Sequence, residues 1–572
     1  MKIKDIVIAV SAVFMLNACN DLNLNPLSEG STESWYSSET EIQMSINDLY
    51  RDPFWPLTQA NGGGGDDAWT DDWMYREALT PVTGGTITSE WSVANTKYWL
   101  NSYKAIGRCN TILSNLDRLS GKVLDQTITR YEAEVRFVRA CQYAKLVFYF
   151  GDAVFYTEPM ELEEAFSLGR TSKSAILPEI YKDLDFAAEH LPASYSASAI
   201  QRATKGAAYA MKARAALCEG DYTTAKTAAK ACIDLGVYKL HPDFASLFLT
   251  STKQSDEFVF VLPRSVEFKL TLSIQDVVPR NTSGGWGAWS PTWDLFCAFP
   301  CTDGLPIDES PLFDPHNPFR NRDPRCSETF VEFNTPHMGF IYQPHPDSLQ
   351  ALNLSTGKWQ TNNDSRGNAQ FASFNGMLWK KGVDNTWLLN NWQVDPAKLI
   401  LRYADVLLMY AEAKIESNDI DESALDAINQ VRARAYGVNY TQTDKYPAVT
   451  TTNQAQLRTV IRTERRIEFA FEGRRYMDII RWRIAEKVLN QPNYGMLDPA
   501  ALREKVVKPG LWFFPETPPI DEDGVADFTA MYNKGLIKKI TQRVFDKNRQ
   551  YLWPIPAKDI LINSNLTQNP NY

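Results

Sequence analysis

The chain has 572 residues, of which 44% are hydrophobic and 22% charged, a composition typical of globular proteins rather than disordered ones. Its formal net charge of −10, from 59 basic and 69 acidic residues, lacks the basic surplus that nucleic acid or an anionic membrane surface would require of a partner. The 16 Trp, 25 Tyr and 28 Phe exceed what a helical core usually needs, so we expect some of them at a recognition surface.

The N-terminus has the features of a bacterial lipoprotein signal. A basic start and an apolar run over Ile6–Leu16 precede Leu16-Asn17-Ala18-Cys19, in which small residues before a cysteine form a lipobox. The run is too short to span a bilayer. We predict a signal peptide over 1–18, then an acylated Cys19 and a flexible tether over 19–40, with the membrane contacted through the lipid anchor only. The alternative is a plain signal peptide with an incidental cysteine.

Apolar periodicity predicts several helices in the first half of the chain. Apolar residues recur at spacings of three and four from Tyr98 to Leu119 and from Tyr131 to Phe150, where Gly151-Asp152 ends the second helix. Small residues dominate Lys205–Leu240 on both sides of Gly220-Asp221-Tyr222. This pattern predicts two closely packed antiparallel helices similar to a tetratricopeptide unit.

A second helix pair is predicted over Leu399–Ile415 and Glu422–Tyr436, with Asn418-Asp419 in the turn. Two other tracts, 51–97 and 241–398, are rich in Pro, Gly, Asn and Trp and lose helical periodicity. Long free loops are rare inside compact proteins, so we expect both tracts to pack on the helices. Binding residues commonly lie on such loops.

These patterns predict a mainly α fold with few short strands. Helix pairs over about 98–240 and 399–490 would form an α/α superhelical scaffold. The tracts at about 51–97 and 241–398 would form an irregular, loop-rich ligand-binding face on it. We expect a single domain over 41–572.

Four sets of segments resemble one known family. They are Leu401-Arg402-Tyr403-Ala404-Asp405-Val406 continuing to Ala413; Arg462–Phe469 continuing through Glu472–Trp482; Trp553-Pro554-Ile555-Pro556 with Gln568-Asn569-Pro570-Asn571-Tyr572; and Glu134–Ala140 with Gly151-Asp152-Ala153. The segments are collinear along the chain and are similar to signatures of the SusD/RagB family of Bacteroidetes nutrient-binding lipoproteins. In the terminal motif, 551–572, Asn571 stands where Gly is common.

The resemblance implies tetratricopeptide-like helix pairs that carry a variable ligand face. It also implies a surface-exposed outer-membrane lipoprotein that captures oligosaccharide, less often peptide, and has a SusC-like TonB-dependent transporter as its partner. We expect no cofactor and no enzymatic activity.

Three glutamates are spaced as one stripe of a helix: Glu464, Glu468 and Glu472. Paired carboxylates on one face can serve acid–base catalysis or hold a metal. Buried charges persist only when they are paired, however. We therefore interpret the stripe as a charge network that ties this helix to Arg402 and Glu412 and holds the fold.

The sequence lacks the residue patterns of a histidine metal site and of a phosphate-binding loop. The five histidines have no metal-ligand spacing, and the tetraglycine at 62–65 lacks the Lys of a phosphate loop. Cys297 and Cys301 could form a local disulfide or half a metal site. Four others, in segments with helical periodicity, are interpreted as buried thiols: Cys109, Cys141, Cys218 and Cys232.

An acidic cluster stands among tryptophans at Asp66, Asp67, Asp71 and Asp72. An exposed loop is the favoured interpretation. A calcium site that includes Asp66 and Asp67 and a glycoside hydrolase that uses two of the four carboxylates are the alternatives.

Sugar rings present apolar C–H faces, so a glycan site needs exposed aromatic platforms beside polar groups. That combination is densest among the Gly-rich residues 284–293 and recurs near Trp69–Tyr75 and Trp91. We predict that the ligand-binding residues are Trp73, Trp91, Trp286, Trp289 and Trp293. The next candidates are Trp359, Trp379, Trp387 and Trp392.

Overall fold

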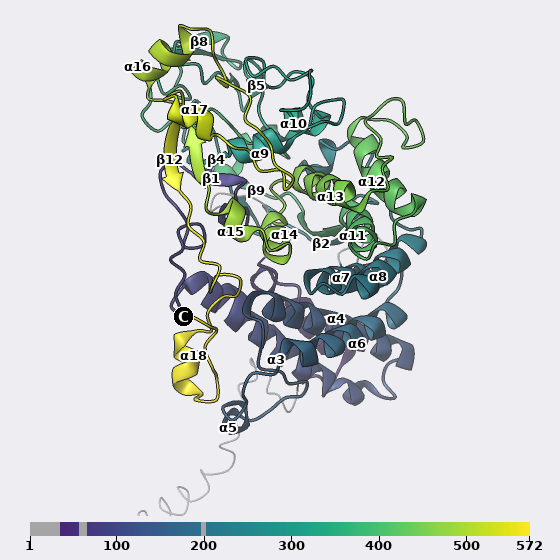
Figure 1. Cartoon of the computed structure of the whole chain (residues 1–572). Helices are drawn as coiled ribbons and strands as arrows, with labels where there is room; N and C mark the ends of the chain where they lie inside the picture. The colour runs from purple at the N-terminus through teal and green to yellow at the C-terminus, as the bar shows by residue number, and fades with distance from the viewer. Residues whose placement is uncertain (1–34, 57–65, 196–201) are drawn as a thin grey trace, which may run out of the picture.

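Stacked helices fill the lower part of the molecule in Figure 1, and loops, short strands and further helices make up the upper part. The computed structural model describes residues 35–56, 66–195 and 202–572. The predicted mainly α fold with short strands is confirmed. Within these residues, no helix has the length and apolar character needed to cross a membrane.

The helices fall into two groups by length. Those of ten or more residues are α2 (Glu39–Asp48), α3 (Asn101–Leu113), α4 (Asp125–Phe150), α6 (Lys173–His190), α7 (Lys205–Cys218), α8 (Tyr222–Asp234), α11 (Tyr403–Glu416), α12 (Glu422–Ala435) and α13 (Gln454–Glu468). The shorter ones are α5 (Leu162–Ala165), α9 (Trp293–Ala298), α10 (Pro324–Thr329), α14 (Arg475–Arg481), α15 (Ala485–Val488), α16 (Pro499–Leu502), α17 (Thr529–Asn533) and α18 (Ala557–Ile562).

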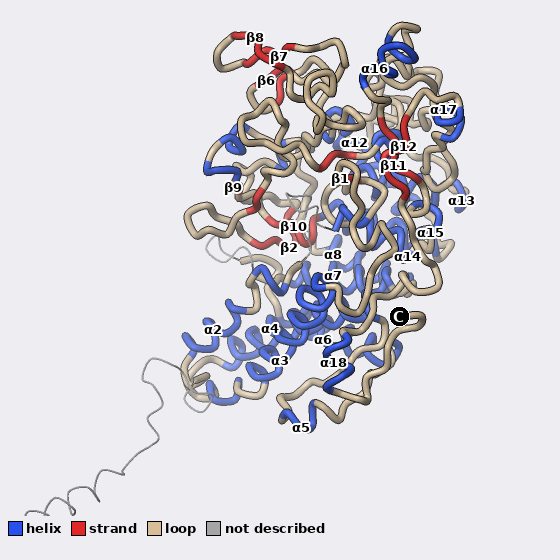
Figure 2. The backbone as a smooth tube through the Cα atoms, turned by 90° about the vertical axis from the view of Figure 1, so that its left-hand side faces the viewer, coloured by secondary structure: helices blue, strands red, loops and turns tan. Residues whose placement is uncertain are grey.

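The long helices pack in one continuous series. α3 packs on α4, α4 on α6, α6 on α7 and α7 on α8. α8 then packs on α11, which also contacts α12 and α13. The series therefore passes directly from α8 to α11, although residues 241–398 lie between them in sequence. Figure 2 shows these helices below and beside the loop-rich part.

The predicted pair over Lys205–Leu240 forms as α7 and α8. Gly220 in the connecting turn has φ +77°, a left-handed conformation that glycine adopts without strain. The Asp221 side chain accepts from the N–H of Thr224 at 3.0 Å and caps α8.

The helix expected over Tyr98–Leu119 is less regular, because a π-helical segment (Val93–Leu100) precedes α3 and a 3₁₀ turn follows it.

The prediction that Leu399–Ile415 is all helix is wrong at its start. β10 (Lys398–Arg402) is a strand that pairs antiparallel with β2 (Phe258–Leu262), and α11 begins only at Tyr403. All five β10 residues are buried, and the periodicity of a short buried run does not distinguish strand from helix. α6 lies within the helical scaffold predicted over about 98–240, although the sequence analysis names no separate helix there.

The remaining strands form small antiparallel sheets in the loop-rich part. The pairs are β1 (Trp73–Tyr75) with β4 (Trp289–Pro291), β3 (Leu272–Ser273) with β9 (Gln393–Val394), and β11 (Pro492–Gly495) with β12 (Lys538–Gln542). A four-stranded sheet contains β5 (Pro336–His337), β6 (Phe340–Ile341), β7 (Gln350–Asn353) and β8 (Lys358–Thr361). The β1–β4 pair joins the two loop-rich tracts of the sequence.

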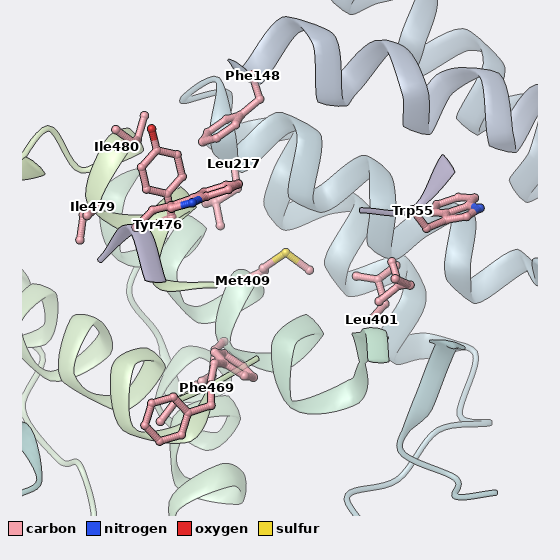
Figure 3. Packing of buried hydrophobic residues seen from close by; sticks show 14 of the residues in the cluster. Trp55, Phe148, Leu217, Leu401, Met409, Phe469, Tyr476, Ile479 and Ile480 are labelled. Carbon is pink, nitrogen blue, oxygen red and sulfur yellow. The ribbon is translucent and has the colours of Figure 1, made fainter. Parts of the chain in front are cut away.

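The core extends from the helix stack into the C-terminal half. Figure 3 shows Phe148 of α4, Leu217 of α7, Leu401 of β10, Met409 of α11 and Tyr476 of α14 around one apolar region. Each side chain is at most 8% exposed. Burial of these side chains joins elements far apart in sequence into one body.

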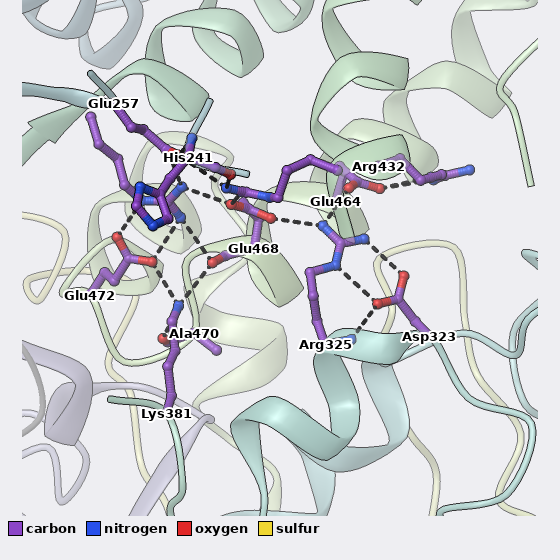
Figure 4. A network of polar contacts seen from close by, with 12 residues as sticks. His241, Glu257, Asp323, Arg325, Lys381, Arg432, Glu464, Glu468, Ala470 and Glu472 are labelled. Carbon is purple, nitrogen blue, oxygen red and sulfur yellow. Dashed lines mark hydrogen bonds and ion pairs between the residues drawn. The ribbon is translucent and has the colours of Figure 1, made fainter. Parts of the chain in front are cut away.

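A buried ionic network lies beside this core, as Figure 4 shows. The guanidinium of Arg402 donates to Glu257, Glu468 and Glu472, each at 2.7 Å. All four side chains are at most 3% exposed. Since Glu468 ends α13 and Glu257 precedes β2, one cation joins the start of α11 to two other elements.

The network continues through a second buried guanidinium. Arg325 of α10 donates to Glu464 at 2.6 Å, Glu468 at 2.9 Å and Asp323 at 2.8 Å. The interpretation of the glutamates as a structural charge network agrees with these pairs. Glu472 lies beyond the end of α13, however, so the three glutamates are not one helical stripe.

Glu412 of α11 is tied to α13 by other partners. It lies 3.5 Å from Arg465 and accepts from Arg481 at 2.5 Å and from the Trp482 indole at 2.6 Å. The expected link between α13 and Glu412 is therefore made by Arg465 of α13 and not by the glutamates.

We predict that Arg402→Gln lowers the free energy of unfolding by about 3–5 kcal/mol, because it leaves three buried glutamates without their shared cation. Arg458→Gln is the control. Arg458 pairs with Glu416 at 2.8 Å with 36% of its side chain exposed, so its loss should cost at most about 1 kcal/mol. Urea unfolding measures both, and similar losses in the two variants would contradict the prediction.

Candidate functional site

The acidic cluster at 66–72 is buried, so the favoured prediction of an exposed loop is wrong. Asp66, Asp67, Asp71 and Asp72 are each at most 2% exposed. Gly62–Gly65, just before them, lie outside the described residues. The sequence pattern did not reveal this burial because the cationic partners lie some 400 residues away in the chain.

Two of the aspartates are bound by arginines of α13 and α14. Asp71 accepts from Arg475 at 2.9 Å and from Arg466 at 2.8 Å, and Asp72 accepts from Arg466 at 2.7 Å. Burial opposes ionisation of Asp71, but Arg466 and Arg475 outweigh it and hold its pKa well below the usual range. These carboxylates fasten the loop to the scaffold and do not face a ligand.

The other two aspartates have few partners. Asp66 accepts from the Tyr98 hydroxyl at 2.7 Å and Asp67 from the N–H of Gly473 at 3.0 Å, while the second oxygen of each is buried without a hydrogen-bond partner. Burial raises the pKa of Asp66 to about 7, although the Tyr98 hydrogen bond lowers it, and raises that of Asp67 well above its ordinary value.

The part of the chain that the structure describes contains no group of three His, Cys, Asp or Glu side chains placed to hold a metal ion. Calcium requires six to eight oxygen ligands, so the Asp66 and Asp67 candidate site finds no support in these residues. Cys297 and Cys301 are buried free thiols, and the considered disulfide is not formed. The four interpreted as buried thiols are also free, although Cys218 is only partly buried.

Three of the five predicted platform tryptophans do not have the exposure that this role needs. Trp73, Trp289 and Trp293 are 2%, 9% and 1% exposed. The Trp73 and Trp289 rings lie parallel with centroids 6.3 Å apart, and the Trp293 indole donates to the carbonyl of Asn375 at 2.8 Å. The β1–β4 pairing places the Trp73 and Trp289 rings in the core, and Trp293 is buried at the start of α9 against Phe513 and Phe514, so the prediction of these three as exposed platforms is wrong.

Trp91 is partly buried in a separate aromatic cluster. Its ring centroid lies 5.7 Å from Trp69 and 4.9 Å from Trp553. Of the predicted five, Trp286 alone is classed as exposed, at 50%. Among the next candidates, Trp359 is 63% exposed on β8, whereas Trp379 and Trp387 are buried.

Around Trp286 several side chains form one surface, which we call the Trp286 surface: Tyr75, Arg76, Arg280, Trp286 and Phe371. Arg76 follows β1, and its backbone N–H donates to Ala288 at 3.1 Å. Its guanidinium donates to the Trp286 carbonyl at 2.6 Å and lies 5.0 Å from the ring centre of Phe371, which is 44% exposed. Aromatic faces and hydrogen-bond donors therefore lie side by side.

The loop that carries Trp286 is held closely to its neighbours. The Trp286 N–H donates to the Gln275 carbonyl at 3.0 Å, and the Gln275 amide donates to the Gly284 carbonyl at 2.8 Å. A Cβ at Gly285 would lie 2.3 Å from the Pro279 carbonyl oxygen, so only glycine fits there. These restraints fix the backbone that carries the Trp286 side chain, so little conformational entropy of the loop is lost when a ligand binds.

Such a surface can hold a ligand that has both flat apolar faces and hydrogen-bonding groups. Sequence reasoning located Trp286 and the neighbouring Trp69–Tyr75 tract but missed Arg76, Arg280 and Phe371. The sequence around each of these three residues does not mark it as part of a site, because only β1–β4 pairing and the packing of residues around 371 bring the three together.

Comparisons with known proteins agree with this architecture. A family model described as the SusD family matches residues 265–572, and one described as starch-binding associating with outer membrane matches residues 41–217. The SusD-like protein P25 of Formosa agariphila is 26% identical over 87% of this chain and 93% of its own length.

Solved structures have the same fold. A SusD-like carbohydrate binding protein from Bacteroides fragilis superposes with a TM-score of 0.75 at 27% identity and covers 93% of this chain and 99% of its own. A laminarin binding SusD-like protein has a TM-score of 0.64 at 19% identity, with coverages of 94% and 100%.

Buried Asp66 should make stability depend on pH. Its folded-state pKa of about 7 lies above its ordinary value of 3.8, so its contribution is retained at low pH and is lost as pH rises through about 7. Asp66→Asn cannot ionise and should lose less stability between pH 5 and pH 8, by on the order of 3 kcal/mol. Urea unfolding at both pH values measures this, and parallel losses in parent and variant would refute it.

Proposed function

Because the chain belongs to the SusD family, we propose that it is a non-catalytic surface lipoprotein that binds oligosaccharide and delivers it to a TonB-dependent outer-membrane transporter. A carbohydrate-binding role is supported by the descriptions of the Bacteroides fragilis and laminarin binding relatives. The family description that refers to the outer membrane supports the location.

The observation that carries the binding proposal is that the half-exposed Trp286 accepts through its backbone carbonyl from Arg76, whose guanidinium lies against the rings of Tyr75 and Phe371. A sugar ring can place its C–H face on the indole while its hydroxyls accept from arginine donors. The loop restraints described above keep the ring in place, so little conformational entropy is lost when a ligand binds.

The proposal of a non-catalytic role is supported by the state of the acidic residues considered for hydrolysis. A glycosidase needs two carboxyl groups about 5–10 Å apart on either side of its substrate. Asp71 and Asp72 instead accept from Arg466 and Arg475 in the interior. Asp66 and Asp67 are buried as well.

Anchoring is part of the proposal. Cys19, which lies outside the described residues, would carry the lipid, and the segment after it would tether the folded domain; the predicted tether boundary at residue 40 is too late, because α2 begins at Glu39. The acyl chains of such an anchor bind membranes because each buried methylene contributes about 0.8 kcal/mol.

Trp286→Ala should lower affinity for a bound oligosaccharide by about 10- to 100-fold, equivalent to ~1.4–2.8 kcal/mol, while the Tm stays within a few degrees. The matched control is Trp293→Ala. Trp293 is buried, so this variant should lose roughly 3–5 kcal/mol of stability. A glycan array identifies the ligand, and calorimetry with thermal melts separates the two effects. Unchanged affinity in Trp286→Ala would show that the site is misplaced.

Cys19→Ala should release the protein from membranes into the soluble fraction, because no other part of the proposed protein binds lipid. Fractionation of cells that express the parent or the variant, followed by immunoblotting, measures the distribution. If the variant stays in the membrane fraction after washes with high salt and mild alkali, the anchor assignment is wrong.

A further inference from the structure

Two arginine side chains converge on the backbone carbonyl of Trp286, whose side chain is half-exposed. Nη2 of Arg76 donates to the Trp286 carbonyl oxygen at 2.6 Å, and Nη1 of Arg280 donates to the same oxygen at 3.3 Å. Two positive groups that share one neutral acceptor repel each other, and this acceptor does not neutralise either charge.

Neither guanidinium forms an ion pair within the described part of the chain. No carboxylate there lies within ion-pair distance of Arg76 or Arg280, and the Nε of each arginine is buried without a hydrogen-bond partner. The carboxylate of Asp276 lies near enough to attract the Arg76 charge but forms no ion pair or hydrogen bond with it. Asp276 contacts Ala288 and Trp289 through its backbone carbonyl.

Asp364 likewise binds backbone rather than the arginine side chain. Its carboxylate accepts from the N–H groups of Arg280 at 2.7 Å and Asn281 at 3.2 Å, and it is 4% exposed. This buried contact fixes the backbone at Arg280 and leaves the guanidinium to point toward Trp286. Elsewhere in the interior, by contrast, Arg466 and Arg475 each pair with carboxylates.

The backbone at Arg76 is held in an uncommon conformation. Its φ of +28° is disfavoured for a residue with a Cβ, and the hydrogen bond from its N–H to Ala288 helps to keep it there. Strained backbone of this kind persists where surrounding structure fixes it, and it is concentrated at ligand sites.

From this geometry we propose that Arg76 and Arg280 form a receptor for an anionic group, so that the ligand is an acidic oligosaccharide bearing carboxylate or sulfate. The inference rests on the proposed glycan-binding function and specifies its ligand class. A sugar ring would lie on Trp286 with its anionic group at the two guanidinium groups. The planar arrangement of guanidinium donors matches carboxylate and sulfate oxygens.

Binding of defined oligosaccharides tests the inference. The probes are oligogalacturonate for carboxylate, carrageenan oligosaccharides for sulfate, and maltooligosaccharide and laminarioligosaccharide as neutral ligands. The variants are Arg76→Gln, Arg280→Gln and Trp286→Ala, with Arg51→Gln as a control at an exposed pair with Asp48. Calorimetry gives affinity, and melting curves verify folding. If Arg76→Gln does not fold, Arg76→Lys, which keeps the charge but loses the planar guanidinium, takes its place in the binding measurements.

We expect at least one acidic probe to bind at least about 10-fold more tightly than the neutral ones, and each Arg→Gln change to reduce that affinity by about 10-fold. Arg51→Gln should have no effect, and added salt should weaken binding of the acidic probe. A preference for carboxylate or for sulfate distinguishes the two sources of charge.

Two results overturn the inference in different ways. If a neutral probe binds as tightly as the acidic ones, or if the Arg→Gln variants keep parent affinity while Trp286→Ala loses it, the anion receptor is wrong and the glycan-binding proposal stands. If the folded parent binds no glycan on a broad array, the proposed function fails with it.

Discussion

The requirement that buried carboxylates be paired with cations organises this molecule. Glu257, Glu464, Glu468 and Glu472 lie in the interior, where an unpaired negative charge is strongly unfavourable. Arg402 pairs with three of them, and Arg325, Lys381 and Arg434 supply their other cationic partners. Because these partners come from distant parts of the chain, the elements that carry them can occupy few alternative positions. Buried ion pairs contribute modestly to net stability, so we regard specification of geometry as their main effect here.

The same principle explains how a loop-rich tract is held in place at the proposed binding surface. The acidic loop at 66–72 is fastened by Arg466 and Arg475, and the strand that follows it pairs with β4. That pairing places Trp73 and Trp289 inward and leaves Trp286 outside, where Arg76 and Arg280 hold its carbonyl. The position of the proposed ligand face therefore depends on these buried ion pairs, and the β1–β4 sheet connects the two regions.

Sequence reasoning succeeded where the determining interactions are local or recur as motifs. The α7–α8 pair followed from small residues around Gly220, and the structural role of the glutamates followed from the cost of burying charge. It failed where residues far apart in the sequence determine the local structure. Leu399–Arg402 is a strand because β2 lies beside it, and a tryptophan is exposed or buried according to strand pairing between residues about 200 positions apart. Glycine-rich context alone did not distinguish Trp286 from Trp289.

The direct passage of the helix stack from α8 to α11 makes residues 241–398 topologically an insertion into a continuous array. Such an arrangement allows a ligand face to diversify while the array keeps its packing. The insertion is nevertheless not freely exchangeable, because Glu257, Asp323, Arg325 and Lys381 within it complete the buried network. A chimera that grafts another ligand face onto these helices would have to keep this four-residue charge set, even if every loop that contacts ligand were replaced.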